Sequence, residues 1–437
     1  MNFDYKNILI MGYGKSGEAV EEIVKKLQVD YKIYDAEKKI TGGNYYSRLT
    51  KKIVRDFDLI VLSPGISIYN KFVSYAERIG IKVIGELEFG YWFTDSPILA
   101  ITGTNGKTTT TRLLNNMVAT TYDCNAFGNI GNPLSMGYKE KLDYMVCEVS
   151  SFQLESTYSF KPYISVILNI AEDHIDRHKT FDNYINCKLG LLKNCTEKSL
   201  VVLNADDKLL MSRTQGLKAK KYYISKFGKV KGVYYLDGKI YCNLTSNQLF
   251  MDMTGHDRYL PLLDDLLASI LVSQLLKIDK EKVIEAIDKF EISPHRLQTV
   301  CVSDGVEYID DSKSTNIHST ENALDSTNKG VVLLLGGVDK NLNFSRIFSA
   351  YGDKLKQVVA FGEARKKIMK FAKKSAFNSI VSHKLFYDAV KYACTVAKDG
   401  DVVLLSPACA SFDEFGSYAE RGDTFVSIIK EYVNAKN

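Results

Sequence analysis

The sequence lacks several features that would place it in a special class of protein. No apolar run reaches the roughly 18 residues that a membrane-spanning helix needs, and no low-complexity stretch or short-period repeat is present. The eight cysteines are scattered, without a C-x-x-C pair, which fits reduced thiols in a cytosol better than disulfides or a zinc site. We therefore expect a globular protein without a membrane span.

A strong charge imbalance is also missing. The chain has 57 Lys and Arg residues against 52 Asp and Glu residues, and no long basic block. Nucleic-acid-binding proteins usually concentrate their basic residues, so we expect no nucleic-acid partner. The first residues, Met1–Lys6, lack the basic-then-apolar order of a signal peptide, which predicts a cytoplasmic protein. A length of 437 residues suggests about two to four domains.

The most informative stretch is Thr102-Gly-Thr-Asn-Gly-Lys107-Thr, which joins a strand-like run to a helical pattern. Its glycines let backbone N–H groups turn toward an anion, and the helix N-terminus adds partial positive charge. Lys107 could reach the terminal phosphates of a nucleotide, and the Thr108 hydroxyl could bind Mg²⁺. The usual phosphate-loop pattern has a glycine where this chain has Ile101. We therefore predict a variant phosphate loop and favour it over a glycine-rich turn without a ligand.

A second glycine-rich loop, Gly12-Tyr-Gly-Lys-Ser-Gly17, lies between a strand-like run and an amphipathic helix near the N-terminus. The following strand ends at Asp35, as in dinucleotide-binding βαβ units. This motif alone is weak. It fits a nucleotide diphosphate site and a turn that serves only packing about equally well.

Strand patterns alternate with helical patterns along the rest of the chain, which predicts mostly parallel sheets. We expect an α/β protein of three domains. Residues 1–93 should form a Rossmann-like domain, 94–296 a central P-loop ATPase-like parallel sheet with a small β insertion at 227–250, and 297–437 a second Rossmann-like domain. Since strand ends meet at one edge of a parallel sheet, Lys107, Glu148 and His174 should converge.

Motifs in all three regions resemble those of the Mur ligases, ATP-dependent amide-forming enzymes of peptidoglycan precursor synthesis. These motifs are Thr102–Thr108, Cys147–Leu154, Glu172–Asp176, Pro294–Arg296 and Asp311–Asn316. Further segments, at Gly336–Lys340, Ser406–Phe415 and Arg421–Asp423, resemble the D-glutamate-adding branch. The resemblance extends from Gly12 to Asp423.

The resemblance implies a reaction and its partners. The carboxylate of UDP-N-acetylmuramoyl-L-alanine would attack the γ-phosphate of ATP, and the amine of D-glutamate would capture the resulting acyl phosphate, releasing ADP and phosphate. Catalysis of this kind depends mainly on positioning and on neutralising phosphate charge. It also implies two Mg²⁺ ions, a UDP-binding first domain, an ATP-binding central domain and a C-terminal domain that binds the amino acid and ATP. We expect a monomer.

The resemblance also assigns roles to residues. Lys107, His174 and Lys188 match catalytic positions, and Lys188 matches a lysine that the family carries in carbamylated form. The matching metal ligands are Thr108, Glu148, His174 and Lys188. The matching ATP contacts are Gly103, Thr104, Asn105, Gly106, Lys107, Thr108, Thr109, Arg296, Asp311 and Lys313. The matching UDP contacts are Gly14, Lys15, Ser16, Asp35, Gly65 and Asn129, which assigns the first glycine-rich loop to uridine diphosphate. The matching D-glutamate contacts are Thr315, Lys340, Ser411 and Phe412.

The chain departs from the family pattern at two places. The family has His-Asn-x-x-Asn for adenine, whereas this chain has Asp264, Asp265 and Ala268, so the recognition of adenine is open. Lys15 stands where an apolar residue is usual, and we expect it to add a charge contact to the UDP diphosphate.

Three alternative interpretations compete with this one. The chain could be another amide ligase, such as the folate-polyglutamate enzyme or the Mur ligase that adds L-alanine or a diamino acid, although it lacks the Asp-Asn-Pro-Arg signature of the last. It could be a nucleotide-binding regulator without turnover, which would not need Lys107, Glu148 and His174. An NAD dehydrogenase built on the first glycine-rich loop would leave the Lys107 loop unexplained.

Overall fold

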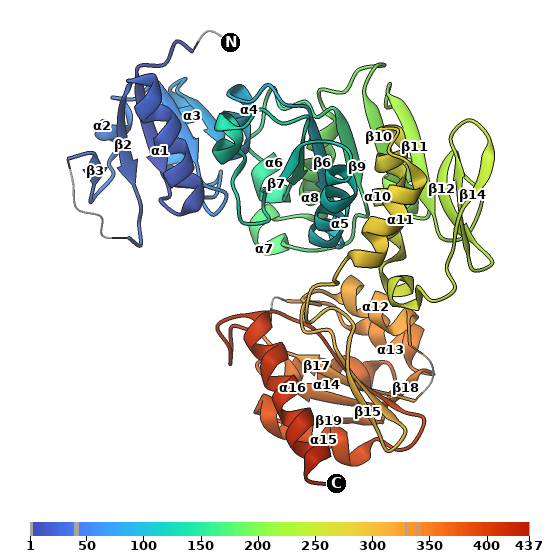
Figure 1. The fold of residues 1–437 in the computed structure, drawn as a ribbon. Helices are drawn as coiled ribbons and strands as arrows, with labels where there is room; N and C mark the ends of the chain where they lie inside the picture. Colours follow the sequence, from blue (N-terminus) through green and yellow to red (C-terminus); the bar gives the residue numbers. More distant parts are fainter. Residues whose placement is uncertain (1–2, 39–42, 328–329, 340, 437) are drawn as a thin grey trace. The chain divides into compact units, whose positions relative to one another are not determined.

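The computed structural model describes residues 3–38, 43–327, 330–339 and 341–436. Its strands form three sheets of five, nine and six strands (Figure 1). Contacts divide the chain into two compact units. Unit 1 comprises residues 1–257 and 262–290, and unit 2 comprises 258–261 and 291–437. The first two sheets thus belong to one unit, and the division of the chain into domains at residues 94 and 297 stays a prediction.

The first sheet of unit 1 is entirely parallel, with strand order β3-β2-β1-β4-β5. Alternate residues of its central strands enter two different hydrophobic clusters: Leu9 and Ile60 in one, Ile8 and Leu59 in the other. Both faces are therefore covered, which is why these strands are continuously apolar. The elements are β1 (Asn7–Met11), α1 (Lys15–Leu27), β2 (Asp30–Tyr34), β3 (Tyr45–Tyr46), α2 (Lys51–Val54), β4 (Leu59–Leu62), α3 (Lys71–Arg78), β5 (Lys82–Gly85) and α4 (Glu86–Trp92).

The second sheet of unit 1 has strand order β14-β13-β12-β11-β10-β9-β6-β8-β7. Seven strands, β6 to β12, run parallel, and β13 and β14 are antiparallel. The strands are β6 (Ile98–Thr102), β7 (Cys124–Gly128), β8 (Tyr144–Glu148), β9 (Ile164–Ile167), β10 (Leu200–Asn204), β11 (Lys220–Ser225), β12 (Gly232–Leu236), β13 (Lys239–Asn243) and β14 (Asn247–Asp252). The predicted β insertion at 227–250 contributes the last three, which extend one edge of this sheet.

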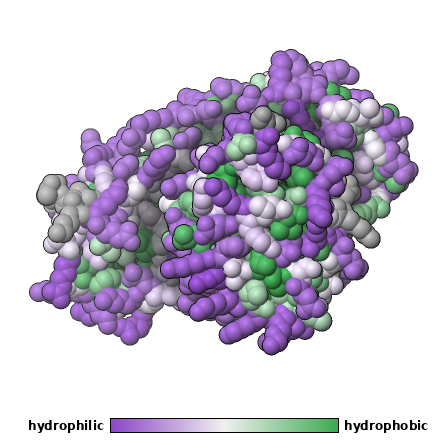
Figure 2. Space-filling view, turned by 90° about the horizontal axis from the view of Figure 1, so that it is seen from below, coloured by the Kyte–Doolittle hydropathy of each residue, from purple (hydrophilic) through white to green (hydrophobic). Residues whose placement is uncertain are grey.

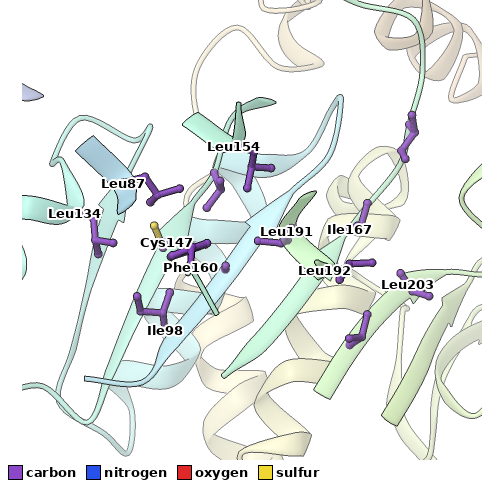
Figure 3. Packing of buried hydrophobic residues seen from close by; sticks show 14 of the residues in the cluster. Leu87, Ile98, Leu134, Cys147, Leu154, Phe160, Ile167, Leu191, Leu192 and Leu203 are labelled. Atoms are coloured by element: carbon purple, nitrogen blue, oxygen red, sulfur yellow. The ribbon is translucent and has the colours of Figure 1, made fainter. Parts of the chain in front are cut away.

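Helices and buried apolar side chains cover this second sheet. Leu87, Ile98, Cys147, Phe160 and Leu203 come from five different elements or connections and lie in one cluster, as Figure 3 shows. The α-helices are α5 (Lys107–Ala119), α6 (Ser151–Leu154), α7 (Ile175–His178), α8 (Phe181–Leu189), α9 (Lys208–Arg213), α10 (Leu263–Leu275) and α11 (Lys280–Lys289). Short 3₁₀ segments are η1 (Leu134–Lys139) and η2 (Gly190–Leu192), and a third, η3 (Asp257–Leu262), contains the residues 258–261 that belong to unit 2. This core fixes the strand ends from which the candidate site is built.

The sheet of unit 2 has order β15-β16-β20-β17-β18-β19 and is parallel except for the β15–β16 hairpin. Alternate residues again separate into two clusters, with Leu333 and Leu404 in one and Leu334 and Leu405 in the other. The elements are β15 (Gln298–Ser303), β16 (Val306–Asp310), α12 (Ile317–Asp325), β17 (Val331–Gly336), α13 (Ser345–Tyr351), β18 (Leu355–Phe361), α14 (Arg365–Lys374), β19 (Ile380–Ser382), α15 (Phe386–Val396), β20 (Val402–Ala408) and α16 (Tyr418–Asn434).

Hydrophilic residues cover most of the face that Figure 2 presents. None of the helices in the described part of the chain combines the length and the apolar character that crossing a bilayer requires.

Candidate active site

The loop between β6 and α5 has the backbone form that its glycines predict. Gly106 has φ +88, in the left-handed region, which side-chain-bearing residues rarely adopt. A Cβ at Gly106 would lie 2.0 Å from the Oδ1 atom of Asp265 on α10. The Thr110 hydroxyl donates a hydrogen bond of 3.1 Å to this same Oδ1. The start of α5 is therefore packed directly against a buried carboxylate, and only glycine fits at position 106.

Side chains from the end of β9 and from α8 hold the same loop in place. The backbone N–H of Asn105 donates to Asn169 Oδ1 at 2.9 Å, and Asn169 Nδ2 donates back to the Asn105 carbonyl at 3.2 Å. The buried hydroxyl of Thr104 lies 2.9 Å from the hydroxyl of Tyr184. The loop is thus fixed by the neighbouring strand and helix before any ligand binds, which lowers the cost of organising it around phosphate.

Two lysines meet at one carbonyl of the loop. Lys107 Nζ donates to the carbonyls of Gly103 at 2.9 Å and Thr104 at 2.8 Å. Lys188 Nζ, from α8, donates to the same Gly103 carbonyl at 2.7 Å and is fully buried. Burial, reinforced by the charge of Lys107, lowers the pKa of Lys188 well below its usual range. A buried lysine amine that gives up its proton readily is able to react as a nucleophile.

Glu148 lies at the end of β8, which pairs with β6 so that Glu148 is opposite Ile101. Its side chain is buried. One oxygen, Oε1, accepts a hydrogen bond from Asn129 Nδ2 at 2.9 Å, whereas Oε2 is buried and has no hydrogen-bond partner in the described structure. Buried polar atoms without a partner are rare, and carboxylate oxygens are the ligands that Mg²⁺ prefers. The residues therefore fit a magnesium ion at this strand end.

His174 has a left-handed backbone, with φ 54, and precedes α7. The backbone N–H of His174 donates a hydrogen bond to Asp173 Oδ1 at 2.8 Å. Its ring lies 4.8 Å from that of Phe152 and 6.5 Å from that of Tyr184, measured between centroids. The side chain is 40% exposed. Tyr184 lies between His174 and the Lys107 loop. Lys107, Glu148 and His174 stand at or after the ends of β6, β8 and β9, which are neighbours in the sheet, and their convergence into one site stays a prediction. Thr108 and Thr109 occupy the first turn of α5.

The residues predicted to bind UDP lie around the first sheet and reach the second. Gly14, Lys15 and Ser16 form the start of α1. Lys15 Nζ lies 3.5 Å from the carbonyl of Gly131, two residues beyond Asn129. Asn129 itself contacts the candidate metal ligand Glu148, which places it at the junction of the two predicted sites.

Asp35 accepts hydrogen bonds from the backbone of the neighbouring loops. Its carboxylate accepts backbone N–H bonds from Tyr13 at 2.7 Å, Glu37 at 2.8 Å and Lys38 at 3.0 Å. Burial opposes ionisation, but these donors prevail and lower the pKa of Asp35. The charged carboxylate thus stabilises the glycine-rich loop directly.

In unit 2, the predicted residues follow two neighbouring strands. Asp311, Lys313 and Thr315 follow β16, and Ser411 and Phe412 follow β20, which pairs with β16. Ser411 is buried, whereas Phe412 is 72% exposed. The Nε atom of Arg296 is buried without a hydrogen-bond partner among the described residues. Lys340 lies outside the described residues.

Asp311 is buried at the base of this cluster. It accepts hydrogen bonds from the hydroxyl of Ser406 at 2.7 Å and the N–H of Leu297 at 3.3 Å. Burial raises its pKa to about 6. A buried carboxylate with a raised pKa in such a cluster is a candidate for a functional site, and its charged form lowers the stability of the fold.

Replacing Asp311 by asparagine should therefore stabilise unit 2. Between about pH 4 and pH 6 the folded protein binds a proton that the unfolded chain has lost, so the charged carboxylate lowers stability as pH rises through this window. We expect Asp311→Asn to raise the free energy of unfolding near pH 8 by up to about 3 kcal/mol, and the gain to shrink toward pH 4. Urea unfolding at several pH values would measure this, with exposed Asp353→Asn as control. A gain that does not depend on pH would contradict the assignment.

Three residues outside the predicted set also contribute to the site of unit 1. Asp265 contacts the phosphate loop, and Tyr184 connects that loop with His174. Arg177, on α7, forms an ion pair with Glu155. Arg177 directly follows the motif Glu172–Asp176 but is not part of it. Helix α7 has only four residues, too few to show a helical repeat of apolar residues that would draw attention to this arginine. The sequence shows that Asp265 departs from the family pattern, but it does not show the contact of Asp265 with Gly106, which depends on tertiary packing.

Comparisons with known proteins find relatives over nearly the whole chain. A family model described as the Mur ligase middle domain matches residues 101–261, and one described as the Mur ligase, glutamate ligase domain matches 295–409. The UDP-N-acetylmuramoylalanine--D-glutamate ligase of Thermoanaerobacter sp. (strain X514) is 36% identical over 99% of both chains. The protein of the same name from Clostridioides difficile (strain 630) is 35% identical over 97% of this chain and 98% of its own.

Solved structures show the same fold at much lower identity. A pseudomurein peptide ligase type C from Methanothermus fervidus aligns with TM-score 0.60 at 17% identity, over 98% of this chain and 100% of its own. The MurF ligase of Thermotoga maritima, solved in complex with ADP, aligns with TM-score 0.61 at 14% identity, over 99% and 96%. Since full-length relatives exceed 30% identity and both domain models match, this chain belongs to the Mur ligase family.

Proposed function

We propose that this protein joins D-glutamate to UDP-N-acetylmuramoyl-L-alanine at the expense of ATP. The observation that carries this proposal is the arrangement at the carboxyl ends of β6 and β8. There, a preformed phosphate loop with Lys107 lies beside a buried carboxylate, Glu148, one oxygen of which has no hydrogen-bond partner in the described structure. A loop of this kind suits a nucleotide triphosphate, and the neighbouring oxygen suits its metal ion.

The proposed reaction has two steps. An oxygen of the substrate carboxylate attacks the γ-phosphorus of ATP, and the bond from that phosphorus to the ADP oxygen breaks. The amine of D-glutamate then attacks the carbonyl carbon of the acyl phosphate, loses a proton and expels phosphate. Lys107 and the loop N–H groups would hold the phosphates, and Thr108, Glu148, His174 and carbamylated Lys188 would hold two Mg²⁺ ions. When bound, Mg²⁺ supplies charge neutralisation at the phosphoryl oxygens.

The remaining assignments belong to the same proposal. Thr315, Lys340, Ser411 and Phe412 would bind D-glutamate, and Arg296, Asp311 and Lys313 would contact ATP. The three sheets would correspond to domains at 1–93, 94–296 and 297–437. We infer a cytoplasmic protein, since all eight cysteines are free thiols and the reaction needs ATP. That it is a monomer stays a prediction.

A ligase assay tests the proposal directly. We expect release of ADP and phosphate only when ATP, UDP-N-acetylmuramoyl-L-alanine and D-glutamate are all present, together with a product whose mass equals the sum of the two joined substrates minus water. L-glutamate, L-alanine and a diamino acid serve as the comparison. Preference for one of these three would overturn the substrate assignment, and phosphate release without an acceptor would overturn the ligase assignment.

Lys15 offers a test of the UDP site. Its exposed ammonium begins α1 and points to the Gly131 carbonyl, and a cation there would attract a diphosphate. We expect Lys15→Leu to raise the KM for the UDP substrate about fivefold, as for a partly exposed charge contact, with kcat unchanged. Lys208, also exposed at the first position of a helix, provides the matched control Lys208→Leu. Equal KM values in Lys15→Leu and the parent would remove Lys15 from the UDP site.

A further inference from the structure

Arg177 connects the two sheets of unit 1 through a set of hydrogen bonds. Its guanidinium donates to the backbone carbonyls of Ile66 at 2.9 Å, Gly65 at 3.2 Å and Pro64 at 3.5 Å. These carbonyls lie in the loop that follows β4 of the first sheet. The guanidinium also donates to Glu155, to Oε2 at 2.7 Å and 3.1 Å and to Oε1 at 3.4 Å. The side chain of Arg177 thus binds the loop after β4 of the first sheet and, at the same time, Glu155 beside the second sheet.

The anchor at Glu155 is buried and well supported. The side chain of Glu155 is 1% exposed and that of Arg177 12% exposed, and the guanidinium lies over the ring of Phe152 at 4.7 Å. His178 Nδ1 lies 3.2 Å from Glu155 Oε1. Hydrogen bonds between an arginine and a carboxylate are charge-assisted and geometrically specific, and separating this pair would leave a buried charge without a partner. The pair therefore holds the guanidinium in place.

The carboxylate of Glu155, the ring of His178 and the thiol of Cys187 offer ligand atoms within 4.8 Å of one another. Two contacts argue against a metal there. Arg177 already neutralises Glu155, and His178 Nε2 lies 3.0 Å from the Ser151 hydroxyl. Burial lowers the pKa of His178 to about 4, so the ring is neutral near pH 7. We therefore assign the cluster to the support of Arg177.

Each end of the bridge lies at a predicted ligand position. Gly65, one of the gripped residues, belongs to the predicted UDP set. At the other end, the backbone N–H of Arg177 donates to the carbonyl of His174 at 3.1 Å, and that of His178 donates to the same carbonyl at 3.0 Å. A shift of Arg177 would therefore move the loop that follows β4 relative to His174.

We propose that Arg177 is a positioning residue that sets the spacing between the uridyl end and the carboxylate end of the UDP-linked substrate. This inference rests on the proposed function. Under the proposed function the substrate would span both ends of the bridge, so the loop at Gly65 would fix one end while the groups around His174 would meet the other. A misplacement of about 1 Å at the reacting carboxylate costs on the order of 100-fold in rate. Arginine is required because a lysine cannot reach three carbonyls and a carboxylate with one ammonium.

The proposal has a signature that a general loss of structure would not produce. Arg177→Met retains every residue that is predicted to contact UDP or ADP, so UDP alone and ADP alone should bind within about twofold of the parent. The kcat/KM for the complete substrate should fall about 100-fold. Arg177→Lys keeps the charge beside Glu155 and should fold normally, yet recover only a small part of the lost kcat/KM. Calorimetry with UDP and with ADP, and ligase kinetics with the complete substrate, provide these values.

Arg213→Met is the matched control and should react like the parent. Among the residues that the structure describes, Arg213 is paired only with the exposed Asp182. Parent-like kcat/KM in Arg177→Lys would overturn the positioning role. A parallel loss of UDP affinity in both Arg177 variants would also overturn it, because the residue would then serve the loop itself. A parent protein without ligase activity would overturn the proposed function and this inference with it.

Discussion

Replacing Lys107 by alanine is expected to lower the rate of ATP-dependent phosphate release by about 1,000-fold. Lys107 is the first residue of α5, and its ammonium is held over the loop by two carbonyls, those of Gly103 and Thr104. Preorganised charges that face a transferring phosphoryl group are among the largest single contributions to catalysis. The alanine variant retains the Gly106 turn and favours a helix at this position, so we expect its melting temperature to stay within a few degrees of the parent's.

Phosphate release should be measured with UDP-N-acetylmuramoyl-L-alanine, D-glutamate and ATP all present. Lys208→Ala removes another lysine that begins a helix of the same unit and should retain full activity. If Lys107→Ala releases phosphate as fast as the parent, the glycine-rich loop does not bind the reacting phosphates. The proposed mechanism would then fail at its first step.

Local sequence patterns predict the elements of this fold well. The apolar strand patterns at 331–335 and 402–405 both fall within strands of the sheet of unit 2, because buried parallel strands are continuously hydrophobic. The glycine at 106 indicates a left-handed turn for an equally local reason. The β insertion was visible as a change from helical to alternating patterns. Its place at the edge of the central sheet depends on strand order, which is tertiary information.

The contacts that the sequence did not predict are tertiary contacts between residues far apart in the chain. The contact of Asp265 with Gly106 joins residues 159 positions apart, and the bridge from Arg177 to Gly65 joins residues 112 positions apart. Neither contact leaves a repeating pattern in the sequence, because each is made by a single side chain that reaches from one element to another. Asn129, expected at the UDP site, contacts Glu148, so one residue lies beside two predicted ligands. The resemblance assigned these residues to separate groups, and the structure shows that the groups adjoin.

The second large effect is expected at Lys188, where stability and activity should change in opposite directions. Below about pH 10 the unfolded chain carries a proton on this amine, whereas the buried amine of the folded protein gives up its proton well below its usual range. The stability of the folded protein therefore falls as pH drops toward neutrality. Lys188→Met fills the same volume without a polar group, so in CO₂-depleted buffer at neutral pH we expect a more stable protein whose stability depends less on pH.

The ligase activity of Lys188→Met should fall about 1,000-fold, because the proposed carbamate ligand for Mg²⁺ cannot form. Burial lowers the pKa of the Lys188 amine well below its usual range, and under the proposed function the same shift would favour its reaction with CO₂. Parent protein equilibrated with ¹³C-labelled bicarbonate should show a carbamate resonance that is absent from Lys188→Met, while Lys193→Met, at a less buried lysine nearby, should retain it. A resonance that survives in Lys188→Met would place the carbamate elsewhere. Full activity in Lys188→Met would show that the amine stabilises only the Gly103 carbonyl and takes no part in binding the metal ions.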